Sequence, residues 1–186
     1  MHRLLIFLLL LAMLPALPAA AQTRFTDVTK EAGIDHVFRV FEGLFGGGAC
    51  VIDFNNDGFE DVYITGGMND DQLLKNNGNG SFTNVFAQSG LTGTRKYVTQ
   101  GVAGADVNRD GFVDLFITTI TSRGVKQAIP REINLFFLNN GNGTFRDATK
   151  EYGLDDELSF STGVSFGDFN ADGWPDVYVG NYFNEF

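Results

Sequence analysis

Three stretches of the sequence carry oxygen-bearing side chains at one spacing. They read 53-DFNNDGFED-61, 106-DVNRDGFVD-114 and 168-DFNADGWPD-176, and we call them Asp loops 1, 2 and 3. Each has Asp at positions 1, 5 and 9, Asn at position 3, Gly at position 6 and an aromatic residue at position 7. Carboxylates this close together repel one another unless something positive lies among them. The spacing therefore predicts a cation site in each loop.

The donor atoms of an Asp loop favour a hard cation. All of them are oxygens, without His or Cys, which disfavours zinc and copper. The side chains at positions 1, 3, 5 and 9 and the backbone carbonyl at position 7 can converge if the loop curls tightly, and Gly at position 6 permits the turn. Calcium accepts about six to eight oxygens in flexible geometry, whereas magnesium requires a strict octahedron. We therefore expect Ca²⁺.

An EF-hand is excluded by position 12. That loop requires Glu there and a helix on either side, whereas position 12 is Ile64, Ile117 or Val179 in this chain. Because these residues lie in short β-branched and aromatic runs, we expect each Asp loop to join two strands. The alternative is an ordinary acidic Asx turn without metal. Three copies in register favour the metal.

Two further motifs recur in constant order with the Asp loops. One reads 76-NNGNGSF-82 and 139-NNGNGTF-145, and the other reads 25-FTDVTKEAGI-34, 82-FTNVFAQSGL-91 and 145-FRDATKEYGL-154. Asn-Gly favours tight hairpin turns. Asp before TKE and Gly after it indicate a single helical turn. A constant order of three motifs identifies a repeat protein.

Each repeat predicts four antiparallel strands, which is one blade of an all-β propeller. A Gly-rich run precedes the Asp loop, and apolar runs covered on both faces follow it. Propellers have about four to eight blades, so an incomplete ring of about three blades predicts a fragment of a longer chain, whose last blade the N-terminal strand completes. The expected segments are 1–21 signal peptide, 22–42 outer strand and linker, 43–97 first blade, 98–158 second blade and 159–186 partial third blade.

Residues 1–21 are predicted to be a cleaved signal peptide. A short basic start, an apolar stretch and Ala19-Ala20-Ala21 support cleavage. A retained anchor is the alternative, although Pro15 and Pro18 interrupt the apolar run. The remaining chain is expected to be secreted or periplasmic and free of the membrane. A net charge of −10 disfavours nucleic acid as a partner.

The motifs resemble those of a known family. GVAGADVNRDGFVDLFIT and NNGNGTF resemble FG-GAP (VCBS) repeats, the calcium-bearing blades of integrin α-chain propellers and of many exported bacterial proteins. FTDVTKEAGI, the Asp loop and DVYVGNYF resemble the cartilage acidic protein (ASPIC/UnbV) group. The resemblance implies a seven-bladed propeller with one Ca²⁺ per Asp loop, or three in this chain. The implied ligands are Asp53, Asn55, Asp57, Phe59 (carbonyl) and Asp61; Asp106, Asn108, Asp110, Phe112 (carbonyl) and Asp114; Asp168, Asn170, Asp172, Trp174 (carbonyl) and Asp176.

We expect a binding or adhesion scaffold, not an enzyme. No nucleophile motif accompanies His36, and Cys50, the single cysteine, lies in an apolar strand. Both are interpreted as structural, and no catalytic residue is assigned. The alternative is the N-terminal part of a secreted propeller enzyme, a hydrolase or lyase, with its catalytic residues in further blades. The expected partner is a protein or carbohydrate ligand at an extracytoplasmic surface.

The segment 121-TSRGVKQAIPRE-132 departs from the repeat pattern. It carries Arg123, Lys126 and Arg131 in an otherwise acidic protein. Loops on rigid scaffolds often bear function, so a partner site is one interpretation. A solvated hairpin loop is the favoured one.

Overall fold

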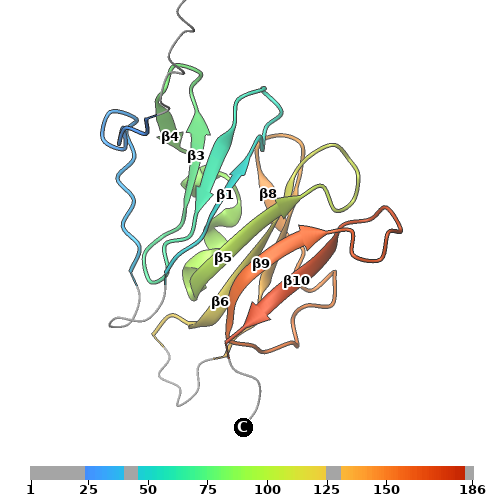
Figure 1. Cartoon of the computed structure of the whole chain (residues 1–186). Coiled ribbons are helices and arrows are strands. Elements are labelled where there is room, and N and C mark those ends of the chain that lie inside the picture. Colours follow the sequence, from blue (N-terminus) through green and yellow to red (C-terminus); the bar gives the residue numbers. More distant parts are fainter. Residues whose placement is uncertain (1–23, 40–45, 125–130, 183–186) are drawn as a thin grey trace, which may run out of the picture.

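The computed structural model describes residues 24–39, 46–124 and 131–182. They form three antiparallel sheets side by side (Figure 1). Two short 3-10 helices, η2 (Phe86–Gln88) and η3 (Leu91–Lys96), connect the first sheet to the second. The strands are β1 (Ala49–Ile52), β2 (Asp61–Ile64), β3 (Gln72–Asn76), β4 (Phe82–Asn84), β5 (Tyr97–Ala105), β6 (Asp114–Ser122), β7 (Leu135–Asn139), β8 (Phe145–Asp147), β9 (Ser161–Gly167) and β10 (Asp176–Asn181).

The sheets are propeller blades, as the repeats predict. The first sheet has the order β1-β2-β3-β4 and the second β5-β6-β7-β8, with antiparallel neighbours throughout. The third sheet contains β9 and β10, which correspond to the first two strands of a blade. The predicted fold class is confirmed: all-β, with two four-stranded blades and two strands of a third.

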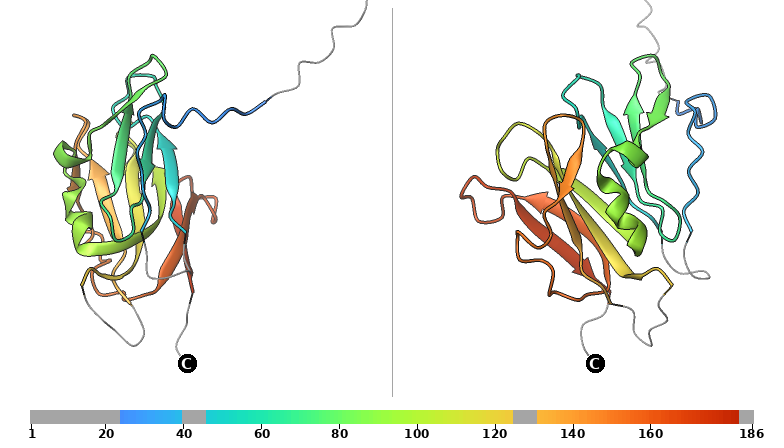
Figure 2. Two further views of the ribbon diagram at one scale, coloured as in Figure 1. Left: turned by 90° about the vertical axis from the view of Figure 1, so that its left-hand side faces the viewer. Right: turned by 180° about the vertical axis from the view of Figure 1, so that it is seen from behind.

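The blades meet along their first strands, and this explains the Gly-rich runs. Strands β1, β5 and β9 lie next to one another in Figures 1 and 2. Gly48 and Gly101 occupy the same place in successive repeats. A Cβ on Gly48 would lie 2.9 Å from the carbonyl oxygen of Gln100, and a Cβ on Gly101 would lie 2.6 Å from that of Thr162. Glycine therefore allows the backbones of neighbouring blades to approach closely.

A threonine reinforces each of these contacts. The Thr65 hydroxyl lies 2.6 Å from the carbonyl oxygen of Gln100 and accepts from the Gly48 N–H at 2.7 Å. In the next repeat the Thr118 hydroxyl accepts from the Gly101 N–H at 2.7 Å and lies 3.4 Å from the carbonyl oxygen of Thr162. The T of DVYIT and DLFIT thus links each blade to the first strand of the next.

Apolar side chains fill the space between the blades. Tyr63, Leu73, Leu115 and Phe137 belong to the cluster between the first two blades. Because sheets cover both of its faces, β6 is buried from Asp114 to Thr121, as its continuous apolar run predicts. In β10, Tyr178 is exposed, since no described sheet covers the face on which it lies, whereas Val179 on the other face packs against the second blade.

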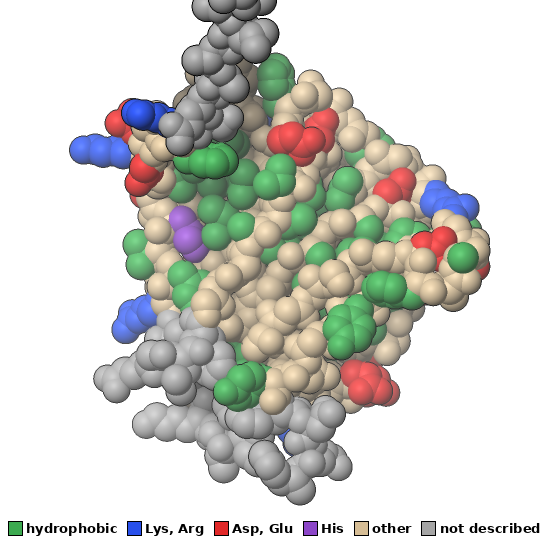
Figure 3. Space-filling view, in the orientation of Figure 1, with side chains coloured by type: hydrophobic (Ala, Val, Ile, Leu, Met, Phe, Trp, Pro, Cys, Tyr) green, Lys and Arg blue, Asp and Glu red, His purple; other side chains and the backbone are tan. Residues whose placement is uncertain are grey.

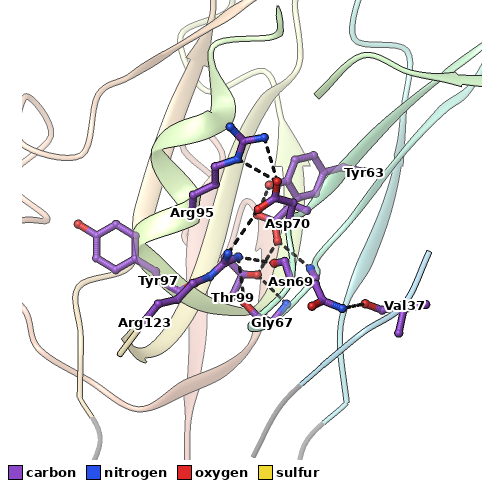
Figure 4. Close-up of polar contacts among 11 residues, drawn as sticks. Val37, Tyr63, Gly67, Asn69, Asp70, Arg95, Tyr97, Thr99 and Arg123 are labelled. Atoms are coloured by element: carbon purple, nitrogen blue, oxygen red, sulfur yellow. Dashed lines mark hydrogen bonds and ion pairs between the residues drawn. The ribbon is translucent and has the colours of Figure 1, made fainter. Parts of the chain in front are cut away.

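A polar network joins the first two blades at the start of β5 (Figure 4). The buried Asp71 carboxylate accepts from the Tyr63 hydroxyl at 2.7 Å and the Thr99 hydroxyl at 2.6 Å. The Arg123 guanidinium donates to the carbonyl oxygens of Tyr97, Gly67 and Asn69. Arg123 therefore holds two blades together, and a partner site in the segment 121–132 stays a prediction. Lys126 lies outside the described residues.

Residues 25–29, the expected outer strand, form no strand here, and Phe25 is 98% exposed. The physical reason is that a strand needs a neighbour to satisfy its backbone groups, and no described strand lies beside this segment. The expectation that this segment completes the last blade of a full ring stays a prediction. The single helical turn that follows is confirmed, since the Thr29 N–H donates to Asp27 Oδ1 at 3.0 Å and Gly33 has a φ of +75°.

The remaining expectations concern the start of the chain and two single residues. Residues 1–21 lie outside the described residues, so the signal peptide stays a prediction. Within the part that the structure describes, no helix is long and apolar enough to cross a membrane. Cys50 is half-buried against the core between the first two blades. The His36 Nε2 atom is buried without a hydrogen-bond partner.

Candidate metal centre

The three Asp loops share one backbone conformation. Gly58, Gly111 and Gly173, at position 6, have φ values of +85°, +89° and +86°. Asn56, Arg109 and Ala171, at position 4, also have positive φ, at 55°, 61° and 59°, which is uncommon for residues other than glycine. Two left-handed residues in one nine-residue loop turn the chain tightly. The local fold therefore has the curl that the ligand spacing requires.

Within each loop the side chains of positions 1 and 3 meet at one backbone N–H. In loop 1 the Asp57 N–H donates to Asp53 Oδ1 at 3.1 Å and to Asn55 Oδ1 at 3.0 Å. The Gly58 N–H donates to the second oxygen of Asp53 at 2.8 Å. The Asp57 carboxylate accepts from the Phe59 N–H at 3.1 Å.

The same bonds recur in the other two loops. In loop 2, Oδ1 of position 1 and Oδ1 of position 3 each accept from the Asp110 N–H at 3.0 Å. In loop 3 the same two atoms accept from the Asp172 N–H at 3.0 Å and 2.8 Å. Position 5 accepts from position 7 at 2.9 Å in loop 2 and 2.8 Å in loop 3. The side-chain oxygens of positions 1, 3 and 5 therefore accept the same backbone hydrogen bonds in all three loops.

The carboxylate at position 9 ties the loop to its blade. Asp61 accepts from the N–H of Phe54 at 3.3 Å and from the N–H of Asn76 in β3 at 2.7 Å. Asp114 accepts from Val107 at 3.0 Å and from Asn139 in β7 at 2.8 Å. The carboxylate at position 9 thus bonds to position 2 of its own loop and to the third strand of the blade.

Burial and mutual repulsion act on this carboxylate. Burial raises the pKa of Asp61 and Asp114, and the backbone N–H groups that they accept from lower it. The charges of the other two Asp side chains in the same loop raise the pKa of Asp61 and Asp114 further. A cation among the three carboxylates would relieve this repulsion.

The Asp loop is also packed onto the Asn-Gly turn, a contact that the sequence analysis missed. A Cβ on Gly78 would lie 2.8 Å from the Phe59 ring, and a Cβ on Gly141 would lie 2.8 Å from the Phe112 ring. The aromatic residue at position 7 therefore rests on the first glycine of NNGNG. The signal was present in the sequence, because an NNGNG motif follows each of the first two Asp loops.

Successive Asp loops contact one another at position 4. The Asn56 amide donates to the carbonyl oxygen of Gly111 at 2.9 Å, and the Arg109 guanidinium lies 3.8 Å from the centre of the Trp174 ring. The loops follow one another along one edge of the molecule (Figure 1), and acidic side chains lie along that edge in Figure 3. Position 4, where the repeats differ, thus links loop 1 to loop 2 and loop 2 to loop 3.

Replacing Arg109 with Ala should expose the face of the Trp174 ring to solvent. A cation over an aromatic face shields it and contributes about 0.5–1 kcal/mol at an exposed site. We expect stronger quenching of Trp174 fluorescence by acrylamide and little change in the unfolding midpoint. Arg146→Ala, at an arginine that pairs with Glu151, is the matched control. Equal quenching of the Arg109→Ala variant and the parent would contradict the contact.

The described residues fit Ca²⁺ in donor chemistry and in loop conformation. The residues that would hold it are positions 1, 3, 5 and 9 by side-chain oxygens and position 7 by its carbonyl. In the described part of the chain, no group of three or more His, Cys, Asp or Glu side chains is gathered for a metal ion. Binding of a cation would therefore draw the three carboxylates of a loop closer together. Bound calcium would supply positive charge that crosslinks the loop.

Comparison with known proteins agrees with the repeat pattern. A model of the FG-GAP-like repeat matches residues 53–117 and 127–179, which is more than half of the chain. Cartilage acidic protein 1 is 45% identical over 49 residues in mouse and in human, and 43% identical over 49 residues in Xenopus tropicalis. Each match covers 26% of this chain and 7–8% of the relative. The match therefore spans only a small part of these longer proteins.

Proposed function

This chain belongs to the FG-GAP-like repeat family, and on that premise we propose that it is a calcium-stabilised propeller segment. Its role is that of a binding or adhesion scaffold at an extracytoplasmic surface, with a protein or carbohydrate ligand. Residues 1–21 direct its export. The similarity to cartilage acidic protein 1 supports a location outside the cell. The role is binding and not catalysis.

One observation carries the proposal of calcium. The bonds among positions 1, 3, 5 and 6 are the same in three loops whose other residues differ. An arrangement that needed only an Asx turn would not require Asn at position 3 and Asp at position 5 each time. A hard cation does require both, because it needs several oxygens at once.

Calcium should raise the unfolding temperature of the chain. A ligand that binds only the folded state stabilises it by mass action. At a concentration about 100 times the dissociation constant, one site should raise the midpoint by about 5–10 °C. The measurement is differential scanning calorimetry in excess Ca²⁺ and in excess EGTA. Identical midpoints under the two conditions would refute the proposal.

The control variants separate the loops from general acidity. Asp57→Ala removes position 5 of loop 1 and should reduce the calcium shift, whereas Asp155→Ala removes an exposed carboxylate outside the loops and should not. A calcium shift that both variants reduce equally would indicate a non-specific effect of charge.

A further inference from the structure

Asp loop 1 has a neighbour that the repeat pattern does not provide. The Lys75 ammonium in β3 lies 3.1 Å from Oδ2 of Asp57, the carboxylate at position 5. Lys75 directly precedes Asn76, whose N–H donates to Asp61 at position 9. The ammonium of Lys75 therefore reaches the middle of the loop from β3, the strand to which position 9 of the loop is bonded.

The corresponding place in the second blade is apolar. Asn139 makes the same bond to Asp114 that Asn76 makes to Asp61, so Leu138 corresponds to Lys75. Their strand partners also correspond, because Lys75 pairs with Thr83 and Leu138 pairs with Arg146. The two blades thus differ in charge at a position fixed by register.

No ammonium takes the place of Lys75 beside Asp loop 2 among the described residues. A cavity of about 300 Å³ lies there, lined by Asp110, Leu138 and Arg146 among others. Arg146 directs its guanidinium to Glu151, with one nitrogen 3.2 Å from a carboxylate oxygen. Within the described parts of the chain, the position-5 carboxylate of loop 2 therefore bonds only within its own loop.

We propose that Lys75 competes with calcium for Asp57 and makes loop 1 the weaker of the first two cation sites. This inference rests on the proposed calcium function. A cation that binds Asp57 must either displace the Lys75 ammonium or lie close to its like charge. The Lys75 side chain is 39% exposed, on a flexible stem, so it can move into solvent. It weakens the site without closing it.

The test needs a reporter for loop 1 alone. The chain has one tryptophan, Trp174, in loop 3. A Phe59→Trp, Trp174→Phe variant places the single indole at position 7 of loop 1, where loop 3 naturally carries it. Terbium is the probe, because a Tb³⁺ ion in loop 1 is sensitised by that indole. Its dissociation constant is then measured by luminescence and, for Ca²⁺, by competition.

In this reporter, Lys75→Leu and Lys75→Gln should both lower the dissociation constant about two- to fivefold, the range that one exposed ion pair corresponds to. Lys75→Arg keeps the charge and should leave the constant near that of the reporter. Lys96→Met is the control. It removes a charge just before β5, at the end of that strand opposite to Asp loop 2, and should leave the dissociation constant unchanged. Calorimetric Ca²⁺ titration of chains with natural Phe59 and Trp174 is the second measurement.

The outcomes distinguish the two proposals. Unchanged dissociation constants in Lys75→Leu and Lys75→Gln, with a calcium shift intact in the parent chain, would overturn the role of Lys75 alone. Absence of Tb³⁺ and Ca²⁺ binding in every variant and in the parent would overturn both. Tighter binding in Lys75→Arg would assign the effect to packing and also overturn competition by charge.

Discussion

Gly101→Ala should lower the free energy of unfolding by about 2–3 kcal/mol, the cost of overpacking a tight interface. Gly163→Ala, at the same place in the next repeat, should leave it nearly unchanged. A Cβ on Gly101 would lie 2.6 Å from the carbonyl oxygen of Thr162 and 3.0 Å from the Thr118 hydroxyl oxygen. A Cβ on Gly163 would meet nothing within 4 Å. The two variants therefore make the same substitution at the same strand position. Gly101 lies between two blades, whereas no described blade covers Gly163.

The measurement is urea unfolding of both variants and the parent in EGTA, which excludes any effect of cations. The Gly101→Ala transition should move to lower urea, whereas Gly163→Ala should match the parent or exceed it slightly, since alanine restricts the unfolded chain more than glycine does. Equal losses in both variants would show that these glycines serve strand conformation and not the approach of neighbouring blades.

The repeated features of this fold could be predicted because they are written in the sequence several times. The Asp loops, the Asn-Gly turns and the four-strand order each recur, and a recurring pattern separates structure from chance. The single turn before Gly33 was equally accessible, because its Asp cap and its terminal glycine are local signals. Such features depend on neighbours within a few residues.

Contacts between blades could not be predicted from those patterns. Asn56 and Gly111 lie 55 residues apart, and the Asn139 amide donates to the carbonyl oxygen of Phe54 across 85 residues. Asn56 stands at position 4, where the repeats differ, so a search for similarity passes over it. The repeated NNGNG motif aligns Lys75 with Leu138, but only the structure shows that Lys75 contacts Asp57.

Two segments show why a local signal is not sufficient. The Phe25 segment has the sequence of an outer strand, but a strand also needs a neighbour with which to pair. Arg123 has the appearance of a solvated charge in a polar loop, yet its fork of donors fits three carbonyl oxygens between blades. In both cases the surroundings, which one local motif cannot specify, decided the outcome.

Asp114→Ala should destabilise the chain by about 3 kcal/mol even without calcium. Asp114 is fully buried and accepts from the backbone N–H groups of Val107 and Asn139. Removing the carboxylate leaves both donors without an acceptor, at a cost of about 1–3 kcal/mol each. Asp114→Asn keeps one oxygen to accept one of these bonds, so about half of the loss is expected. Urea unfolding in EGTA measures both.

Asp110→Ala in the same loop separates the structural role of Asp114 from metal binding. Asp110 is exposed and accepts from the Phe112 N–H, which water can also satisfy, so its removal should change stability little in EGTA. Both variants remove a proposed ligand of loop 2, so both should lose the same part of the calcium shift. If Asp110→Ala kept the full shift while Asp114→Ala lost it, the loss would reflect damage to the blade, because a ligand set that includes position 5 requires the two losses to be equal.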